Sequence, residues 1–263
     1  GGTAGDRPRR RGDDAGGIRR DRLRAGRRAG APGQGHPSAR LARAPDCQTG
    51  TSLALAFADG QRHFVSCQPN NASLGLEDLD LGVLPGYRHL YRADIWFSAR
   101  MLFGGNARLF AAARQAGLTV SMDVNFDPWW GIATEAQTER RKRAVRDVLP
   151  LVDVVHGNIG ELNRFAGAAA LSTSLSRLAD WGSQAVVVHM GAAGAGWYAD
   201  GRLTVVPACP AARQVNTGGT GDVLSVCMML LHEHADPTAR LQLANQVVAQ
   251  YIDGRRPLIP RLD

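Results

Sequence analysis

Lysine is almost missing from this chain of 263 residues. The sequence has 31 basic residues, and Lys142 is the single lysine among them. A phosphate-binding loop of the Gly-Lys-Ser/Thr type needs a lysine directly after its last glycine, and Lys142 lies in no such context. Catalysis through a lysine Schiff base has only this one candidate residue. Both mechanisms are therefore excluded or strongly disfavoured.

Cysteine pairs and long apolar runs are also absent. The four cysteines, Cys47, Cys67, Cys209 and Cys227, include no Cys-x-x-Cys pair, which is typical of reduced thiols in a cytoplasmic protein. No apolar run reaches the roughly 18 residues that a membrane span requires. The start of the sequence has no apolar segment, so we expect no secretory signal. These observations predict a cytoplasmic protein that makes no membrane contact.

The positive charge of the chain is confined to its first segment. Residues 1–46 contain twelve arginines and five aspartates, which accounts for the whole formal net charge of +7. The only large apolar residues between positions 6 and 46 are Ile18, Leu23 and Leu41. Such a segment cannot bury enough apolar surface to offset the entropy cost of ordering it. We therefore divide the chain into an atypical Arg/Gly-rich segment, 1–46, and one folded domain, 47–263.

Three interpretations of residues 1–46 stay open. The segment is a disordered basic tail, a polyanion-binding tail, or an out-of-frame translation of a GC-rich gene, in which Arg, Gly, Ala and Pro codons dominate. Nucleic-acid binding is disfavoured because no aromatic residues are interleaved for base stacking. Reading the gene in its other frames tests the third interpretation.

Beyond residue 47 the pattern is that of an α/β domain. We expect a hairpin over residues 51–67, because an Asp59-Gly60 turn signal separates two runs rich in strand-forming residues. Strands are predicted at 93–97, 118–124, 151–156 and 184–190, and helices at 106–115, 135–148, 159–165 and 172–181. Alternation of strands and helices favours a mostly parallel sheet with helices on its faces.

A glycine-rich run carries the clearest chemical signal. Residues 215–223 read VNTGGTGDV, and an apolar helical run follows directly. The glycines allow backbone N–H groups to converge at a helix N-terminus, where an anion is stabilised. Asp222 lies where it could take a proton from a hydroxyl that attacks a phosphate held there. The alternative is an ordinary tight turn before a buried helix.

Three further segments follow predicted strands, at the sheet edge where α/β proteins bind ligands. Residues 121–130, SMDVNFDPWW, supply either a polar and aromatic wall for a sugar or nucleoside, or a loop with Asx turns and packed tryptophans. Asn158 and Glu161 have the spacing of a helix capping box, the interpretation we favour from the residues alone. Residues 191–196 read GAAGAG and lead to a strand, so a dinucleotide fingerprint fails. His189 before them is more typical of a packed residue than of a metal ligand.

Taken together and in order, these segments resemble the ribokinase-like (PfkB) carbohydrate kinase family. The strongest similarity is that of Asn216–Asp222 to the family's Asp-Thr-x-Gly-Ala-Gly-Asp signature. Asn158-x-x-Glu161, the strand entering Gly191-x-x-Gly194, and Asp123-x-Asn125 also match. The resemblance covers about residues 49–255. It implies a three-layer α/β/α fold with a mostly parallel sheet and a small β lid, of which the lid and N-terminal part are expected to be incomplete here.

The resemblance also implies an activity and its residues. The reaction is transfer of the ATP γ-phosphoryl group to a hydroxyl of a sugar or related polyol, with Mg²⁺ as cofactor. Asp222 is then the general base, and the N–H groups of Gly219, Thr220 and Gly221 form the anion hole. Nucleotide-side and acceptor-side residues are implied at further positions. The nucleotide side comprises Asn158, Glu161 (with Mg²⁺, through water), His189, Gly191, Gly194 and Asn216; the acceptor side comprises Gly1, Gly2, Asp123 and Asn125.

Departures from the family pattern keep alternatives open. Asn216 stands where the family has aspartate, which leaves monovalent-cation dependence undecided. Phe126 and Asp127 replace a common arginine, which leaves the acceptor undecided. A nucleoside kinase on the same fold, or a catalytically impaired nucleotide- or sugar-binding member, are the alternatives. A homodimer that pairs through residues 53–57 and 63–67 is also left open.

Overall fold

The computed structural model describes residues 46–57, 62–216, 218–232 and 236–255. Contacts divide the chain into two units, Gly1–Arg43 and Ala44–Asp263, and the second contains all described residues. Within the described ranges, no helix is both long enough and apolar enough to cross a membrane.

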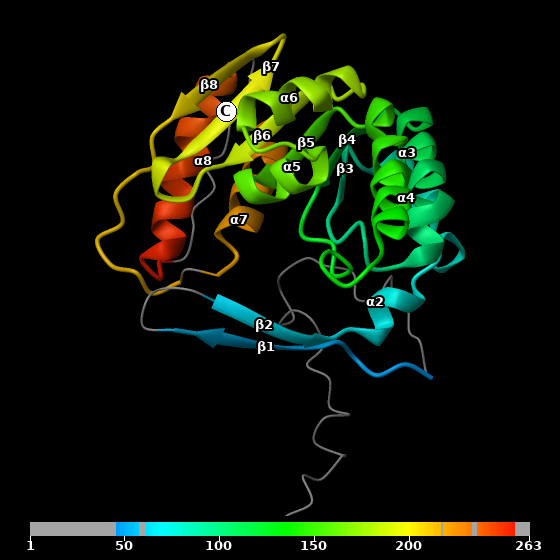
Figure 1. Cartoon of the computed structure of the whole chain (residues 1–263). Helices are drawn as coiled ribbons and strands as arrows, with labels where there is room; N and C mark the ends of the chain where they lie inside the picture. The colour runs from blue at the N-terminus through cyan, green and yellow to red at the C-terminus, as the bar shows by residue number, and fades with distance from the viewer. Residues whose placement is uncertain (1–45, 58–61, 217, 233–235, 256–263) are drawn as a thin grey trace, which may run out of the picture. The chain divides into compact units, whose positions relative to one another are not determined.

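A six-stranded sheet forms the centre of the domain (Figure 1). Its strands follow one another in space in the order in which they occur along the chain. They are β3 (His89–Arg92), β4 (Thr119–Asp123), β5 (Val154–Asn158), β6 (Ala185–His189), β7 (Ala195–Ala199) and β8 (Arg202–Val206). β3 to β6 are parallel, whereas β7 and β8 are antiparallel to their neighbours. The predicted mostly parallel central sheet is confirmed.

Helices cover both faces of this sheet and produce three layers (Figure 1). One layer consists of α3 (Asn106–Gln115), α4 (Glu135–Arg146), α5 (Ile159–Ala166) and α6 (Leu171–Asp180), and the other of α7 (Thr220–Leu230) and α8 (Pro237–Ile252). Alternation along β6 shows the division: Val186 and Val188 join the core under the first layer, and Val187 joins the core under the second. This is the predicted α/β/α arrangement.

Short helical turns complete the connections. They are α2 (Pro69–Ser73), the 3₁₀ turns η2 (Leu76–Asp78), η3 (Leu81–Gly86), η5 (Leu149–Leu151) and η6 (Gly191–Ala193), and the π-helical segment η4 (Met101–Gly105). Helix starts follow local capping chemistry. Thr134 and Gln137 form a capping box at α4, and Asp236 caps α8 ahead of Pro237.

The predicted strand at 93–97 is wrong. The strand at this place is β3, His89–Arg92, and residues 93–97, the β3 loop, form a turn instead. Asp94 adopts a φ of 53°, a left-handed conformation that ends extended backbone. Ile95 and Trp96 are nevertheless fully buried in the core. Their apolar character reflects that burial and not a strand.

The predicted hairpin is confirmed in its two strands. β1 (Thr51–Ala56) pairs antiparallel with β2 (Arg62–Cys67), and its turn lies outside the described residues. Leu53, Phe64 and Val65 are about 60% exposed, at 59%, 63% and 63%. An isolated two-stranded ribbon is only marginally stable in water. A homodimer in which a second copy covers these residues stays a prediction.

Candidate active site

Helix α7 begins at the glycine turn, residues 218–222. Gly219 precedes the helix with a φ of 78°, a conformation that glycine adopts without strain. No described side chain caps this helix, so the first N–H groups remain available to a ligand. Asp222 lies in the first turn and is exposed to solvent. A bound anion and a carboxylate would therefore be neighbours here.

Helix α8 holds the glycine turn in place. The Tyr251 hydroxyl donates to the Gly218 carbonyl at 2.8 Å, and a Cβ added at Gly219 would lie 3.2 Å from that hydroxyl. The Asn216 side-chain amide donates to the Tyr251 carbonyl at 3.0 Å. Asn216, a predicted nucleotide-side residue, is therefore anchored to the end of α8. Tyr251 was not predicted as a site residue, because a tyrosine among apolar residues is typical of core packing.

A cavity of about 460 Å³ opens beside the glycine turn. Its lining includes the predicted residues His189, Gly191, Gly194, Thr220 and Gly221. The far wall consists mainly of apolar side chains from α8 and from the segment after β8: Ala208, Pro210, Val248 and Ile252. A largely apolar cleft can hold a heterocycle, and the N-terminus of a neighbouring helix can hold an anionic group.

Two glycines of the η6 loop, residues 190–194, are expected to differ sharply in their tolerance of alanine. Both have positive φ, 58° at Gly191 and 105° at Gly194. A Cβ at Gly194 would lie 2.1 Å from the Val206 carbonyl oxygen, whereas a Cβ at Gly191 meets open space. We expect Gly194→Ala to lower the free energy of unfolding by about 3 kcal/mol or more, and Gly191→Ala by about 1 kcal/mol. Urea denaturation of both variants measures this, and equal losses would contradict it.

Buried Asp123 links β4 to α7. One carboxylate oxygen accepts from the Tyr91 hydroxyl at 3.2 Å and from the Ser225 hydroxyl at 3.4 Å, and the other accepts from the Asn125 N–H at 3.1 Å. The last bond is the Asx turn that the sequence allowed as the structural alternative. Ser225 lies one helical turn after Asp222. Asp123 thus fixes the face of α7 that carries Asp222.

His189 packs directly beneath the glycine turn as a neutral imidazole. Its Nε2 lies 3.3 Å from the Ser225 hydroxyl, and its Nδ1 lies 3.0 Å from the position of a Cβ added at Gly221. Burial lowers the pKa of His189 to about 4, although Asp222 raises it. At neutral pH this histidine therefore supports the turn without adding positive charge.

Asn158 and Glu161 form the capping box that their spacing predicts. The Asn158 side chain accepts from the Glu161 N–H, and the Glu161 carboxylate accepts from the Asn158 N–H, both at 2.9 Å. Burial raises the pKa of Glu161 to about 7, and the carboxylates of Asp123 and Asp222 also raise it. Glu161, in the first turn after the end of β5, therefore interacts electrostatically with both aspartates.

Asp222 itself has a raised pKa. Desolvation is the largest cause, followed by the charges of Asp123 and Asp94. Asp94 is exposed on the β3 loop, and its backbone N–H donates to the Asn125 side-chain oxygen at 2.8 Å. Asp94 was missed because the sequence placed it inside a strand. An accessible carboxylate with a raised pKa is suited to accept a proton from a substrate.

The loop that follows β4, residues 124–130, carries the predicted acceptor residue Asn125 and three aromatic rings. Phe126 and Trp129 are 55% and 45% exposed, whereas Trp130 is 6% exposed and packs against Trp96 in the core. Of the two tryptophans that the sequence offered as a wall, only Trp129 therefore has an accessible ring. The packed Trp130 and the Asx turn at Asp123 confirm the structural interpretation in part, whereas the role of Asn125 and Trp129 as a wall for a sugar or nucleoside stays a prediction.

The predicted acceptor residues Gly1 and Gly2 lie outside the described residues. In the described part of the chain, no group of three or more His, Cys, Asp or Glu is arranged to hold a metal ion. Mg²⁺ is commonly held by one or two carboxylates together with substrate phosphates and water. Glu161, whose pKa is raised by the charges of Asp123 and Asp222, fits that manner of binding.

The fold and site define an α/β protein in which a helix N-terminus, with a carboxylate in its first turn, lies beside the carboxyl end of a parallel strand. The chain belongs to the pfkB family of carbohydrate kinases, whose family model matches residues 37–253. No curated protein sequence matches the chain significantly.

Solved structures of the same fold include three kinases. A fructokinase with bound ATP from Xylella fastidiosa is 22% identical, with a TM-score of 0.64, and the match covers 79% of this chain and 68% of that one. The adenosine kinase of Sinorhizobium meliloti is 18% identical, with a TM-score of 0.64 and coverages of 79% and 61%. Arabidopsis thaliana ribokinase, complexed with ribose and ATP, is 18% identical, with a TM-score of 0.60 and coverages of 77% and 62%. The chain thus spans about two thirds of the length of these proteins.

Proposed function

We propose that residues 47–263 transfer the γ-phosphoryl group of ATP to a hydroxyl of a sugar or related polyol. The observation that carries this proposal is the position of Asp222 in the first turn of α7, whose N-terminus has no described side-chain cap and borders the 460 Å³ cavity. Family membership supports the same chemistry, because the matched family is one of carbohydrate kinases.

In the proposed mechanism the acceptor hydroxyl lies between Asp222 and the glycine turn. Asp222 takes the hydroxyl proton as the oxygen attacks the terminal phosphorus, and the bond from that phosphorus to the ADP oxygen breaks. The N–H groups of Gly219, Thr220 and Gly221 stabilise the charge on the phosphoryl oxygens. Mg²⁺, when bound, neutralises phosphate charge. The Asn158 N–H holds the Glu161 carboxylate at the end of β5.

Magnesium dependence is expected to vary with pH through Glu161. Its pKa of about 7 leaves the carboxylate partly protonated at neutral pH, and only the ionised form binds a hydrated cation. The magnesium concentration for half-maximal ADP release should therefore rise as the pH falls from about 8 to about 6. Glu161→Gln should raise that concentration at both pH values and remove most of its pH dependence. Glu139→Gln, an exposed change on α4, is the control.

Glu161 is also expected to make the free energy of unfolding depend on pH. The pKa of about 7 in the folded chain exceeds the ordinary glutamate pKa of 4.5, so the folded chain binds the proton more tightly than the unfolded chain. Without magnesium, this group should lower stability as the pH rises from about 4.5 to about 7. Urea denaturation across this range should show a smaller decrease in Glu161→Gln, and an unchanged profile would contradict the assignment.

The direct test is Mg²⁺-dependent ADP release with a panel of sugars, polyols, sugar acids and nucleosides. An acceptor-dependent rate with a sugar or polyol supports the proposal and identifies the acceptor class. Thermal stabilisation by ATP without release for any acceptor would overturn it in favour of a nucleotide-binding protein that does not catalyse transfer.

A nucleoside kinase is the second candidate, because the exposed rings of Phe126 and Trp129 border the acceptor side. Aromatic faces of this kind stack on bases. A rate that is higher with nucleosides than with every sugar in the panel would favour this candidate. Trp129→Leu should then raise the KM for the nucleoside and leave the KM for ATP unchanged.

A further inference from the structure

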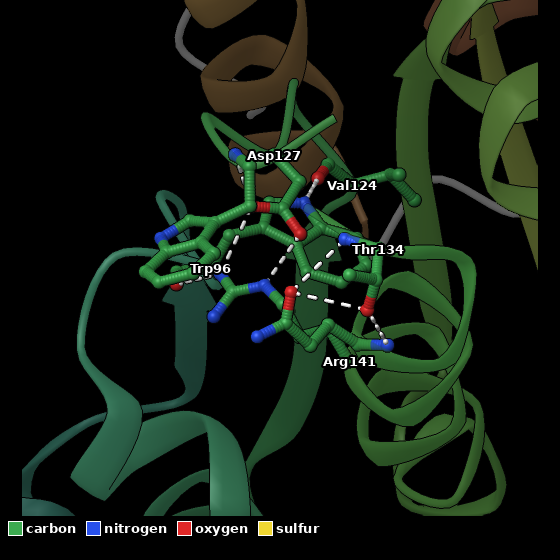
Figure 2. Close-up of polar contacts among 7 residues, drawn as sticks. Trp96, Val124, Asp127, Thr134 and Arg141 are labelled. Carbon is green, nitrogen blue, oxygen red and sulfur yellow. Dashed lines mark hydrogen bonds and ion pairs between the residues drawn. The ribbon is translucent and has the colours of Figure 1, made fainter. Parts of the chain in front are cut away.

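A buried ion pair joins α4 to the β4 loop, residues 124–130. Arg141 of α4 donates from Nε and Nη2 to the two carboxylate oxygens of Asp127, at 2.7 and 2.9 Å. The Asp127 side chain is 0% exposed and that of Arg141 is 8% exposed. Figure 2 shows the two side chains meeting between the segments that carry Trp96 and Val124. This bidentate geometry fixes both the distance and the plane of the pair.

The pair ties the β3 loop to the β4 loop. Arg141 Nη2 also donates to the Trp96 carbonyl at 2.6 Å, and the Trp96 indole N–H donates to the Val124 carbonyl. A closed chain of hydrogen bonds therefore links α4, residues 93–97 and residues 124–130 (Figure 2). Beyond this chain, the Asp94 N–H donates to the Asn125 side chain, and both residues have positive φ, 53° and 47°.

The same pair orients the exposed aromatic residue of the β4 loop. The Trp129 N–H donates to Asp127 at 3.0 Å, and the Arg141 guanidinium lies 5.2 Å from the Trp129 ring centroid. Replacing a buried ion pair by apolar residues of similar volume is often neutral or stabilising, so stability alone gives a weak reason for such a pair. What this pair supplies is a defined geometry for Asn125 and Trp129.

We infer that Asp127 and Arg141 are positioning residues that hold the β4 loop in the conformation that binds the phosphoryl acceptor. This inference rests on the proposed function, since it takes Asn125 and Trp129 to face the acceptor. Neither Asp127 nor Arg141 touches the reacting atoms. Their effect is therefore on acceptor binding and orientation, while the nucleotide cavity, built from α7, α8 and the η6 loop, is unaffected.

The test separates the KM for the acceptor from the KM for ATP. Asp127→Asn keeps the shape of the side chain and removes its charge, and Arg141→Lys keeps the charge and removes the bidentate fork. We expect each to raise the acceptor KM about tenfold to a hundredfold and to change the ATP KM less than about twofold. The control is Asp153→Asn, which weakens the pair that Arg114 forms with Asp153 at 2.8 Å, beside the N-terminal ends of β4 and β5.

A loss that is only structural would raise both KM values together or appear equally in Asp153→Asn, and either result would overturn the inference. Hydrogen exchange provides a readout that does not depend on turnover. In Asp127→Asn, exchange should accelerate in residues 93–97 and 124–130 and stay unchanged in 189–194 and 218–222. If the wild-type chain releases no ADP with any acceptor, the proposed function fails, and unchanged exchange in the β4 loop would separately overturn the positioning role.

Discussion

Replacing Asp222 by asparagine is expected to lower the rate of acceptor-dependent ADP release by about 10²- to 10⁴-fold, the usual contribution of a general base. Asparagine keeps the size of the side chain but cannot take up the acceptor proton. The N–H groups of the glycine turn and the neighbouring cavity are unchanged, so the dissociation constant for ATP should change little. Single-turnover ADP formation and ATP titration monitored by calorimetry measure the two quantities.

A matched control for this variant is available in the turn between β7 and β8. Asp200→Asn makes the same chemical change at an exposed residue with a φ of 51°, a conformation that asparagine also adopts. It should leave both rate and affinity unchanged. If Asp222→Asn retained more than about a tenth of the wild-type rate, the base would have to be another residue, and Asp94 would be the next to test.

The rate should also fall in acid solution. The raised pKa of Asp222 means that protonation inactivates the base at a higher pH than for an ordinary aspartate. Because the desolvation and neighbouring carboxylates that raise this pKa persist with bound acceptor, the acidic limb of the kcat profile should report it. Asp222→Asn should lack that limb in its residual activity.

The second large effect is expected for Arg141→Met, on stability. This change removes the charged partner of Asp127, whose side chain is 0% exposed, and leaves a buried carboxylate without its ion pair. Breaking a buried pair in this way costs about 3–5 kcal/mol, a large part of the roughly 5–15 kcal/mol that stabilises a typical domain. Urea denaturation, with the m-value held as a check on two-state behaviour, measures the loss.

Two further variants test whether the unpaired carboxylate causes this loss of stability. Arg114→Met removes a partner from an ion pair whose side chains are 40% and 23% exposed, and should cost no more than about 1 kcal/mol. The double variant Arg141→Met with Asp127→Leu should recover part of the loss, because no uncompensated charge remains. If the double variant were less stable than Arg141→Met alone, the loss would come from the missing ion pair and not from the unpaired carboxylate of Asp127.

Interactions between residues close in the sequence explain the elements that were predicted correctly. The start of α5 follows from the spacing of Asn158 and Glu161, and α3 was predicted at its observed bounds, Asn106–Gln115. The glycine turn before α7 was also evident, since its glycines and Asp222 lie within one short segment. In each case the interacting groups are within a few residues of one another.

Contacts between distant segments account for what was missed. The Asp123–Ser225 hydrogen bond joins residues 102 positions apart, and neither residue has a local pattern that announces it. The positive φ of Asp94 has no glycine to signal it, so the apolar residues after it were interpreted as a strand. The pairing of Asp127 with Arg141 depends on how α4 packs against the β3 loop, which periodicity alone does not determine.

The sequential order of the strands has a consequence for how the domain is made. Each strand from β3 to β8 pairs with its neighbour in the chain, so the sheet can grow by one strand at a time as the polypeptide leaves the ribosome. Helices α7 and α8 come after the last strand and cover a face that has stood open until then. Asp222 and the glycine turn arrive with them. Nascent chains halted after β8 should therefore already contain the folded strand ends of β4 and β5 while lacking the carboxylate that we assign to proton transfer.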